Sequence, residues 1–125
     1  MGEWDFRIII PIVYNAKIVS FTGRTIVNNS IRYKNLSNQK AIISNKNILY
    51  NLDNCNEKWI VLVEGPFDCW RLGPYNISCS FGIELTEKQI SLLARRFEKV
   101  IFLFDKEKEA QQRAKSMVNV WQVLS

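Results

Sequence analysis

Two apolar runs in the sequence each end at an acidic residue, and these carboxylates are the side chains best suited to do chemistry. Glu64 comes directly after the apolar residues 60–63, and Asp105 comes directly after residues 100–104. A carboxylate at the end of such an apolar strand lowers stability unless its charge is compensated. Both acids are therefore candidates for a functional site.

Four carboxylates would meet at one place if the two runs are neighbouring parallel strands. Right-handed helical crossovers bring the carboxyl ends of such strands to one edge of a sheet, which is where ligands bind in these folds. We expect Glu64 and Asp105 at this edge, joined by Asp68 and Glu107 from the segments that follow. Since four crowded negative charges repel one another, a cation must neutralise them, and hard oxygen ligands predict Mg²⁺ or Mn²⁺.

Each of these acids taken alone also has an ordinary explanation. Asp68 and Glu107 could be first-turn residues favoured by a helix dipole, and Asp105 could be a helix cap. It is the coincidence of two strands that both end on an acid that favours the metal-site interpretation.

The segment from residue 59 onward predicts alternating strands and helices that would position these acids. Residues 60–63, 77–80 and 100–104 are typical of buried strands, the second of them ended by Gly82. Pro66 suits the first position of a helix, and Thr86 with Gln89 forms a capping box before a second helix. The residues that recur at helical spacing in that second helix are Ile90, Leu93, Ala94 and Phe97. A last helix is predicted to carry on one face Ala110, Ala114, Met117, Val118 and Trp121.

The first part of the chain predicts a hairpin and a basic surface. Residues 6–13 and 17–22 are expected to be strands joined across Asn15 and Ala16, with Gly23 ending the second. Residues 27–56 are rich in Asn, Ser and Lys and predict only turns and short elements. Seven basic residues and no acidic one lie between Asp5 and Asp53, namely Arg7, Lys17, Arg24, Arg32, Lys34, Lys40 and Lys46. This distribution favours a polyanion such as a nucleic acid, although a merely soluble basic face is an equal alternative.

Composition sets further bounds. The chain of 125 residues, 47% of them hydrophobic, fits one ordinary domain with a real core. It has no apolar run long enough to span a membrane and no signal peptide at its start, so we expect a soluble, cytoplasmic protein. The absence of histidine excludes Ser-His and Cys-His catalysis. The three cysteines are expected to be small buried residues, and a core position is also expected for Trp59, Trp70 and Trp121.

Several segments together resemble a known family. The stretches VLVEGPFDCWRLG, SCSFGIELTEKQISLL and VIFLFDKEKEAQQRAKSM resemble the Toprim domain, with its E-G-x-x-D and D-x-D motifs. Upstream, FRIIIPIVYNAKIVSFTGRTI and RYKNLSNQKAIISNKNILYNL resemble the segments that precede Toprim in bacterial and phage DnaG-type primases. The resemblance covers nearly the whole chain.

This resemblance implies a DNA-templated RNA polymerase that makes short primers in DNA replication. By position, Glu64 and Asp68 match E-G-x-x-D, and Asp105 and Glu107 match D-x-D. The catalytic set is then these four acids, of which Glu64, Asp105 and Glu107 would bind the metal. Single-stranded DNA or nucleotide would be held by Arg24, Arg32, Lys34 and Lys46, where Asn45 is an alternative to the last. The implied partners are a single-stranded DNA template, nucleoside triphosphates and, as a further candidate, a replicative helicase.

The sequence also departs from the family pattern. Glu107 stands where the second aspartate of D-x-D is usual, and the A-G-x-x-A that commonly follows is not kept at residues 108–112. We expect neither a zinc ribbon nor a helicase-binding domain in this chain and interpret it as a minimal core, which a phage could encode.

The sequence therefore predicts an α/β protein in two parts. Residues 1–57 form a small, basic, β-rich subdomain, and residues 58–125 form a Toprim-like parallel sheet flanked by helices and short at its C-terminal end. The predicted function is metal-dependent primer synthesis. The alternatives are a non-catalytic accessory protein that binds single-stranded DNA and a Toprim-family nuclease.

Overall fold

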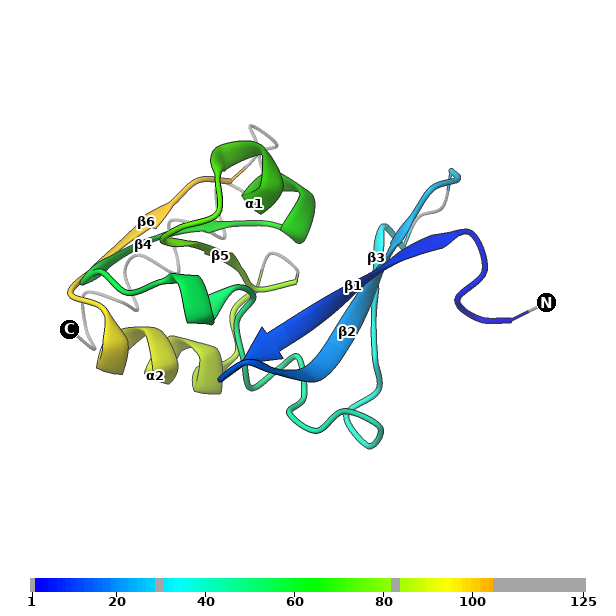
Figure 1. The fold of residues 1–125 in the computed structure, drawn as a ribbon, viewed down its shortest axis with the longest axis horizontal. Coiled ribbons are helices and arrows are strands. Elements are labelled where there is room, and N and C mark those ends of the chain that lie inside the picture. Colours follow the sequence, from blue (N-terminus) through cyan, green and yellow to red (C-terminus); the bar gives the residue numbers. More distant parts are fainter. Residues whose placement is uncertain (1, 29–30, 82–83, 105–125) are drawn as a thin grey trace.

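A three-stranded antiparallel sheet forms the first part of the molecule. The computed structural model describes residues 2–28, 31–81 and 84–104. Strands β1 (Arg7–Tyr14) and β2 (Lys17–Thr25) form the predicted hairpin, and β3 (Tyr33–Asn35) pairs with the far half of β2. The turn of the hairpin lies near the rest of the molecule, and the other end of the sheet extends away from it (Figure 1).

The hairpin turn is held by an acidic side chain from a distant segment. Asn15 and Ala16 both have positive φ angles, of 51° and 62°. The backbone N–H groups of these two residues donate hydrogen bonds of 2.8 Å to the carboxylate of Asp53, one to each oxygen. Since a left-handed conformation is unfavourable for alanine, this clamp helps to fix a turn that the sequence alone makes costly.

The second strand runs further than the sequence predicts. Gly23 was expected to end it, but β2 continues to Thr25. The reason is pairing on both sides, because Gly23 lies opposite Ile9 of β1 and opposite Lys34 of β3. Strand β3 has no recognisable signal in its polar sequence, and it forms because β2 offers it a partner.

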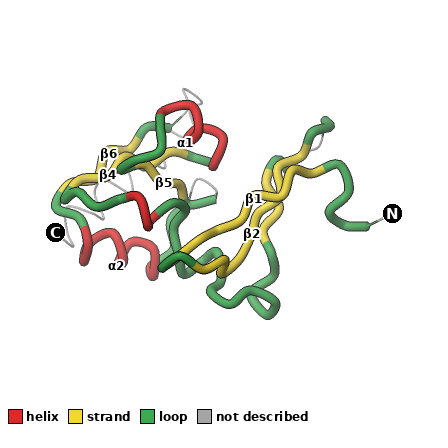
Figure 2. The backbone as a smooth tube through the Cα atoms, viewed as in Figure 1, coloured by secondary structure: helices red, strands yellow, loops and turns green. Residues whose placement is uncertain are grey.

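A parallel sheet with a helix on each face forms the second part. Its strand order is β5-β4-β6, and both strand pairs are parallel. The helices α1 and α2 lie on opposite faces of this sheet (Figures 1 and 2). The bounds of the elements are β4 (Trp59–Val63), α1 (Pro66–Leu72), β5 (Ile77–Cys79), α2 (Glu87–Arg96) and β6 (Lys99–Phe102), with a 3₁₀ turn η1 (Leu52–Asn54) before them. The predicted last helix lies outside the described residues, as does Gly82.

Both helix starts agree with the sequence prediction. Pro66 occupies the first turn of α1. At α2 the Thr86 hydroxyl accepts a hydrogen bond from the Gln89 backbone N–H, and the Gln89 side chain accepts one from the Thr86 backbone, so the capping box is complete. The Gln89 amide also donates to the backbone carbonyls of Asn45 (2.9 Å) and Ile48 (3.0 Å). The start of α2 is thereby fastened to the first part of the chain.

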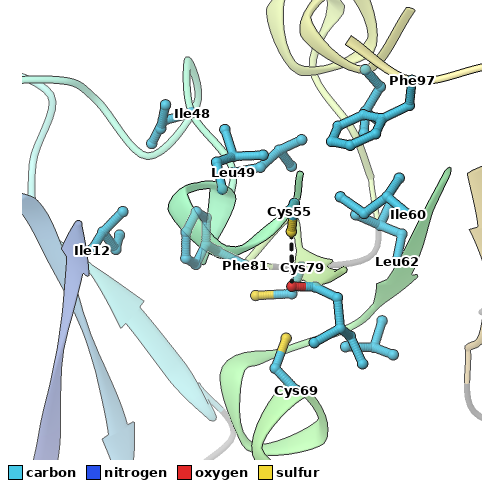
Figure 3. Packing of buried hydrophobic residues seen from close by; sticks show 14 of the residues in the cluster. Ile12, Ile48, Leu49, Cys55, Ile60, Leu62, Cys69, Cys79, Phe81 and Phe97 are labelled. Atoms are coloured by element: carbon cyan, nitrogen blue, oxygen red, sulfur yellow. Dashed lines mark hydrogen bonds between the residues drawn. The ribbon is translucent and has the colours of Figure 1, made fainter. Parts of the chain in front are cut away.

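One hydrophobic core connects the two sheets (Figure 3). Ile12 of β1, Leu49 from the connecting segment, Leu62 of β4 and Leu93 of α2 belong to the same buried cluster and have no more than 1% of their surface exposed. The connecting segment therefore packs as part of the core. The division of the chain at residues 57 and 58 stays a prediction.

The cysteines are buried and free, as predicted. Burial raises the pKa of the Cys55 thiol to about 11. Burial also raises the pKa of Cys79, and a hydrogen bond with Cys69 adds to that effect. Cys55 and Cys79 therefore serve as small apolar residues, because the thiolate form of each is strongly disfavoured at neutral pH.

The prediction of core positions for the tryptophans is wrong for two of them. Trp59 is 42% exposed and Trp70 is 55% exposed, while Trp121 lies outside the described residues. Trp59 lies at the beginning of the central strand, and Trp70 lies on the outer side of the short helix α1, so neither position faces the core. Neither described helix is long and apolar enough to cross a lipid bilayer.

Candidate active site

The carboxyl ends of β4 and β6 lie side by side, as the predicted site requires. Leu62 pairs with Phe102, and the Leu103 backbone N–H donates a 2.9 Å hydrogen bond to the Leu62 carbonyl. Glu64 comes directly after β4 and Phe104 comes two residues after β6, so both follow the carboxyl ends of paired strands. The condition on which the predicted site depends, that the first and third strands of this sheet are neighbours, is therefore met.

Two of the four predicted carboxylates are described. Glu64 follows β4 directly and is half-buried. Asp68 lies in the first turn of α1, where the helix dipole favours a negative charge, and its carboxylate is 3.6 Å from the guanidinium of Arg71. Asp105 and Glu107 lie outside the described residues, so the meeting of all four acids stays a prediction.

The donor set suits a hard divalent cation. Within the described ranges no three His, Cys, Asp or Glu side chains come close enough together to hold a metal ion. Glu64 and Asp68 supply carboxylate oxygens at the edge, and the residue after Phe104 in the sequence is Asp105. Oxygen donors without histidine fit Mg²⁺ or Mn²⁺, and a complete site would need the acids that follow β6.

Tyr33 holds the loop that carries the predicted E-G-x-x-D motif. Its hydroxyl accepts a 3.3 Å hydrogen bond from the backbone N–H of Phe67. A β-carbon added to Gly65 would lie only 2.6 to 2.8 Å from atoms of the Tyr33 ring. The glycine is therefore required for space, because its φ angle of −146° is one that any residue can adopt. Tyr33 comes from β3, so a residue of the basic part of the chain shapes the acidic loop.

Tyr33 was not among the predicted site residues. A signal for it existed, because Tyr33 belongs to the stretch RYKNLSNQKAIISNKNILYNL, which resembles a segment of the DnaG-type primases. Burial raises the pKa of its hydroxyl, an effect that the hydrogen bond from Phe67 and the charge of Arg24 partly oppose. The phenol is thus neutral at physiological pH and accepts the hydrogen bond without ionising.

Arg24 lies against the same loop. Its guanidinium carbon is 5.4 Å from the centre of the Tyr33 ring and 5.5 Å from that of Phe67, which are cation–π distances. This predicted binding residue therefore lies beside the loop that begins at Glu64. Among the described residues the guanidinium donates one hydrogen bond, to the carbonyl of Thr25, so its other donors can reach an anionic ligand.

The other predicted basic residues are not gathered around Arg24. Lys34 lies on the opposite face of the antiparallel sheet, where it forms a 2.9 Å ion pair with Glu3 and lies over the ring of Trp4. Arg32 is exposed, next to Tyr33 in the chain. Lys46 is exposed and lines a shallow cavity of about 350 Å³ near the start of α2.

Asn45, the alternative to Lys46, has a structural role. Its buried side chain accepts a hydrogen bond from the Ser20 hydroxyl and donates one of 3.2 Å to the Phe21 carbonyl. It joins the connecting segment to β2 and offers nothing to a ligand. Of the two candidates, Lys46 alone has a side chain in solvent.

Backbone strain is also present at this edge. Phe81, just beyond β5, has a φ angle of 65°, which is rare for a bulky residue. Its side chain is buried against the Tyr50 ring at a centroid distance of 6.3 Å. Such strain persists only where packing enforces it and is found more often at functional sites than elsewhere.

Comparison with known proteins identifies the class to which this arrangement corresponds. No family model matches the chain. A search of solved structures finds the Aquifex aeolicus primase, described by its zinc-binding and RNA polymerase domains, with a TM-score of 0.81 and 29% identity over 94% of this chain and 32% of that one. A DnaG primase catalytic domain bound to single-stranded DNA has a TM-score of 0.71 and 26% identity over 89% of this chain and 38% of that one. A primase domain from Pseudomonas aeruginosa shares the fold with a TM-score of 0.81 at 23% identity, over 93% of this chain and 39% of that one. The fold is that of the catalytic region of DnaG-type primases.

The sequence comparisons lead to the same proteins. The chain is 33% identical over 113 residues to the DNA primase of Clostridium acetobutylicum, covering 84% of this chain and 19% of the relative. It is 31% identical over 121 residues to the DNA primase of Aquifex aeolicus, covering 90% of this chain and 24% of the relative. The resemblance to DnaG-type DNA primases is confirmed, and the chain spans about a fifth to a quarter of the length of these relatives.

Proposed function

We propose that this chain is a primase-type catalytic core that synthesises RNA primers on single-stranded DNA during replication, with Mg²⁺ or Mn²⁺ as cofactor. The observation that carries the proposal is the parallel pairing of β4 with β6 at the edge where Glu64 lies, with Arg24 fixed beside the loop that follows. The relatives named DNA primase and the structural neighbour bound to single-stranded DNA support it.

The reaction would join a nucleoside triphosphate to a hydroxyl of a second nucleotide. The attacking oxygen forms a bond to the α-phosphorus while the bond from that phosphorus to pyrophosphate breaks, and the hydroxyl proton passes to solvent. When bound, divalent metal would activate the hydroxyl and neutralise the charge that develops on the leaving pyrophosphate. We assign metal binding to Glu64, Asp105 and Glu107, with Asp68 completing the catalytic set.

The chain's own cations would orient the substrates. The Arg24 guanidinium, whose position is fixed by contacts with two rings, can form paired hydrogen bonds to a phosphate without losing much side-chain freedom. Arg32, Lys34 and Lys46 are predicted to attract the DNA backbone from more distant positions. Because Lys34 lies on the other face of the sheet, its contribution would be long-range attraction.

The proposed parts of the chain divide this work. Residues 1–57 would supply the cations, and residues 58–125 would form the Toprim sheet with its acids. The two parts share one core, so the division is one of function. We place the protein in the cytoplasm, where template and triphosphates are found, and this would be the host cytoplasm for a phage-encoded chain. A replicative helicase remains a proposed partner.

A primer-synthesis assay tests the proposal. The full chain is incubated with single-stranded DNA, labelled ribonucleotides and Mg²⁺ or Mn²⁺, and product lengths are read on a gel. We expect new RNA products that fall at least about 100-fold in Glu64→Gln and Asp105→Asn, because each removes a charge from the metal set. Glu98→Gln is the matched control, since this exposed acid lies at the opposite edge of the sheet.

The same gel separates the alternatives. A nuclease would shorten a labelled oligonucleotide, and an accessory protein would bind it without any product. A second measurement follows the melting temperature during Mn²⁺ titration. The primase proposal predicts a saturable increase that Glu64→Gln removes, and a wild-type chain with neither product nor Mn²⁺ response would refute it.

A further inference from the structure

Four aromatic side chains follow one another from the candidate active site along α1. Tyr33 meets Phe67 edge to face at a centroid distance of 6.3 Å, and Phe67 lies 4.9 Å from Trp70 with its ring tilted by 34°. The indole N–H of Trp70 donates a 3.0 Å hydrogen bond to the hydroxyl of Tyr50. We call Tyr33, Phe67, Trp70 and Tyr50 the aromatic row.

Trp70 is the most exposed member of the aromatic row. Tyr33 and Phe67 are partly buried, whereas more than half of the Trp70 surface, 55%, is open to solvent. Trp70 lies beside a cavity of about 370 Å³, lined by Tyr50, Asn51, Cys69, Trp70, Gly73 and Pro74. The hydrogen bond to Tyr50 holds the indole in place, so a flat apolar surface is presented to solvent.

Positive charge flanks the aromatic row. The Arg24 guanidinium lies over the rings of Tyr33 and Phe67 at one end. At the other end Arg71 follows Trp70 in the chain with 77% of its side chain exposed, and its pairing with Asp68 is long, at 3.6 Å. The net charge of the chain is +5. A ligand that fits here has flat apolar groups joined by negative charges.

Single-stranded nucleic acid has this chemistry. Proteins that bind it without reading its sequence combine cations for the backbone with aromatic rings on which bases stack. A protein partner would need no cations beside the row, and the core gains little from an indole that is mostly in solvent. The combination on α1 therefore favours a nucleic-acid strand over an apolar protein surface.

We propose that Trp70 is a base-stacking site for single-stranded DNA, which extends the path of the strand from the candidate active site outward along α1. This inference rests on the proposed function, because it assumes that the strand enters at the edge where Glu64 and Arg24 lie. It adds a contact to which neither the acidic motifs nor the basic residues point.

The test measures binding of a fluorescently labelled oligothymidine to the full-length chain by anisotropy. Trp70→Ala is expected to weaken binding about fivefold or more, the range for loss of one stacked base. Trp70→Leu, which keeps apolar volume without a ring, should weaken it similarly, and Trp70→Phe should stay within about twofold of wild type. Trp59→Ala is the matched control, because Trp59 is also exposed but lies at the opposite edge of the sheet.

Salt dependence gives a readout that altered folding would not produce. An indole carries no charge, so Trp70→Ala should leave the slope of log affinity against log salt unchanged. Arg24→Gln should reduce that slope by about one phosphate contact.

The outcomes distinguish this inference from the proposed function. If the wild-type chain makes primers while Trp70→Ala and Trp70→Leu bind as tightly as wild type, the stacking site is wrong and the primase proposal stands. Equal losses in Trp59→Ala and Trp70→Ala would also overturn it. A wild-type chain that neither binds the oligonucleotide nor makes primers refutes both.

Discussion

The amino edge of the parallel sheet, where its strands begin, uses its polar groups differently from the carboxyl edge, where they end. At the amino edge the Lys58 carbonyl accepts hydrogen bonds from the backbone of Glu98 and Lys99, and the Asn76 side chain accepts one from Glu57. At the carboxyl edge the polar side chains are acids and an arginine held by aromatic rings. The first arrangement satisfies the backbone, and the second presents charge.

The two edges also differ in backbone strain. Both have a non-glycine residue in the left-handed region, Asn76 at φ 58° and Phe81 at φ 65°. Asparagine tolerates this conformation, whereas phenylalanine does not, so the costly residue lies at the carboxyl edge. The residue with the larger conformational cost therefore lies at the edge where the chemistry is predicted, and strained residues are often found at functional sites.

The largest effect is expected from Gly65→Ala at the carboxyl edge. The new β-carbon would meet the Tyr33 ring, so we expect the free energy of unfolding to fall by about 2–3 kcal/mol, as for other overpacked sites. Urea denaturation measures it. The control is the same change in a Tyr33→Leu background, where the loss should become much smaller. An equal loss in both backgrounds would show that Tyr33 is not the obstacle.

A somewhat smaller loss of stability is expected from Gln89→Leu. Gln89 lies in the first turn of α2, near the carboxyl edge of the parallel sheet. The change leaves the buried carbonyls of Asn45 and Ile48 and the N–H of Thr86 without their partner, at a cost of about 2 kcal/mol. The neighbouring exposed residue provides the control, Lys88→Ala, which should be nearly neutral. A neutral Gln89→Leu variant would contradict the role of this side chain as a fastener.

Gly73→Ala tests the other end of α1. This glycine has a φ angle of 124° and open space around it, so the cost of alanine is purely conformational, about 1–2 kcal/mol. Because Gly73 lies at the opposite end of α1 from Glu64 and Gly65, Mn²⁺ binding should be unchanged. Thermal melting with and without Mn²⁺ checks both statements, and a lost metal response would contradict the second.

A weaker effect on stability is expected at alkaline pH, where the thiol of Cys55 near the amino edge ionises. Burial raises the pKa of its thiol to about 11, above the ordinary value of 9.0. The folded state therefore holds its proton while the unfolded chain releases it, and stability present below pH 9 is lost as the pH rises towards 11. Cys55→Ala should flatten this part of the stability curve. An unchanged slope would show that other groups account for the loss.

The smallest effect is expected from the ion pair at the amino edge. Lys58 and Glu98 are 3.3 Å apart, but about three quarters or more of each side chain is exposed, so Glu98→Gln should change stability by at most about 0.5 kcal/mol. Its primer synthesis should equal that of wild type. A large loss of activity would erase the functional difference between the two edges.

Local signals account for what the sequence could predict. Pro66, the Thr86 capping box and the apolar runs of β4 and β6 each act through neighbouring residues, and all these elements form, although β6 covers Lys99–Phe102 where residues 100–104 are predicted. The contact of Tyr33 with the loop after β4 and the formation of the short strand β3 depend instead on partners that are distant in the sequence. The exposure of Trp70 was missed for a related reason, because a helix of seven residues offers too little periodicity to show which side faces the core.

The shared core has a consequence for the order of folding. Ile12 and Val19 of the hairpin precede Leu93 and Phe97 in the sequence by most of the described chain, yet all four belong to one buried cluster. The hairpin cannot complete its packing until α2 has been synthesised. Until then its apolar side chains are exposed to solvent or bound by a chaperone. A chain whose synthesis halts before α2 would therefore remain incompletely folded and prone to aggregation.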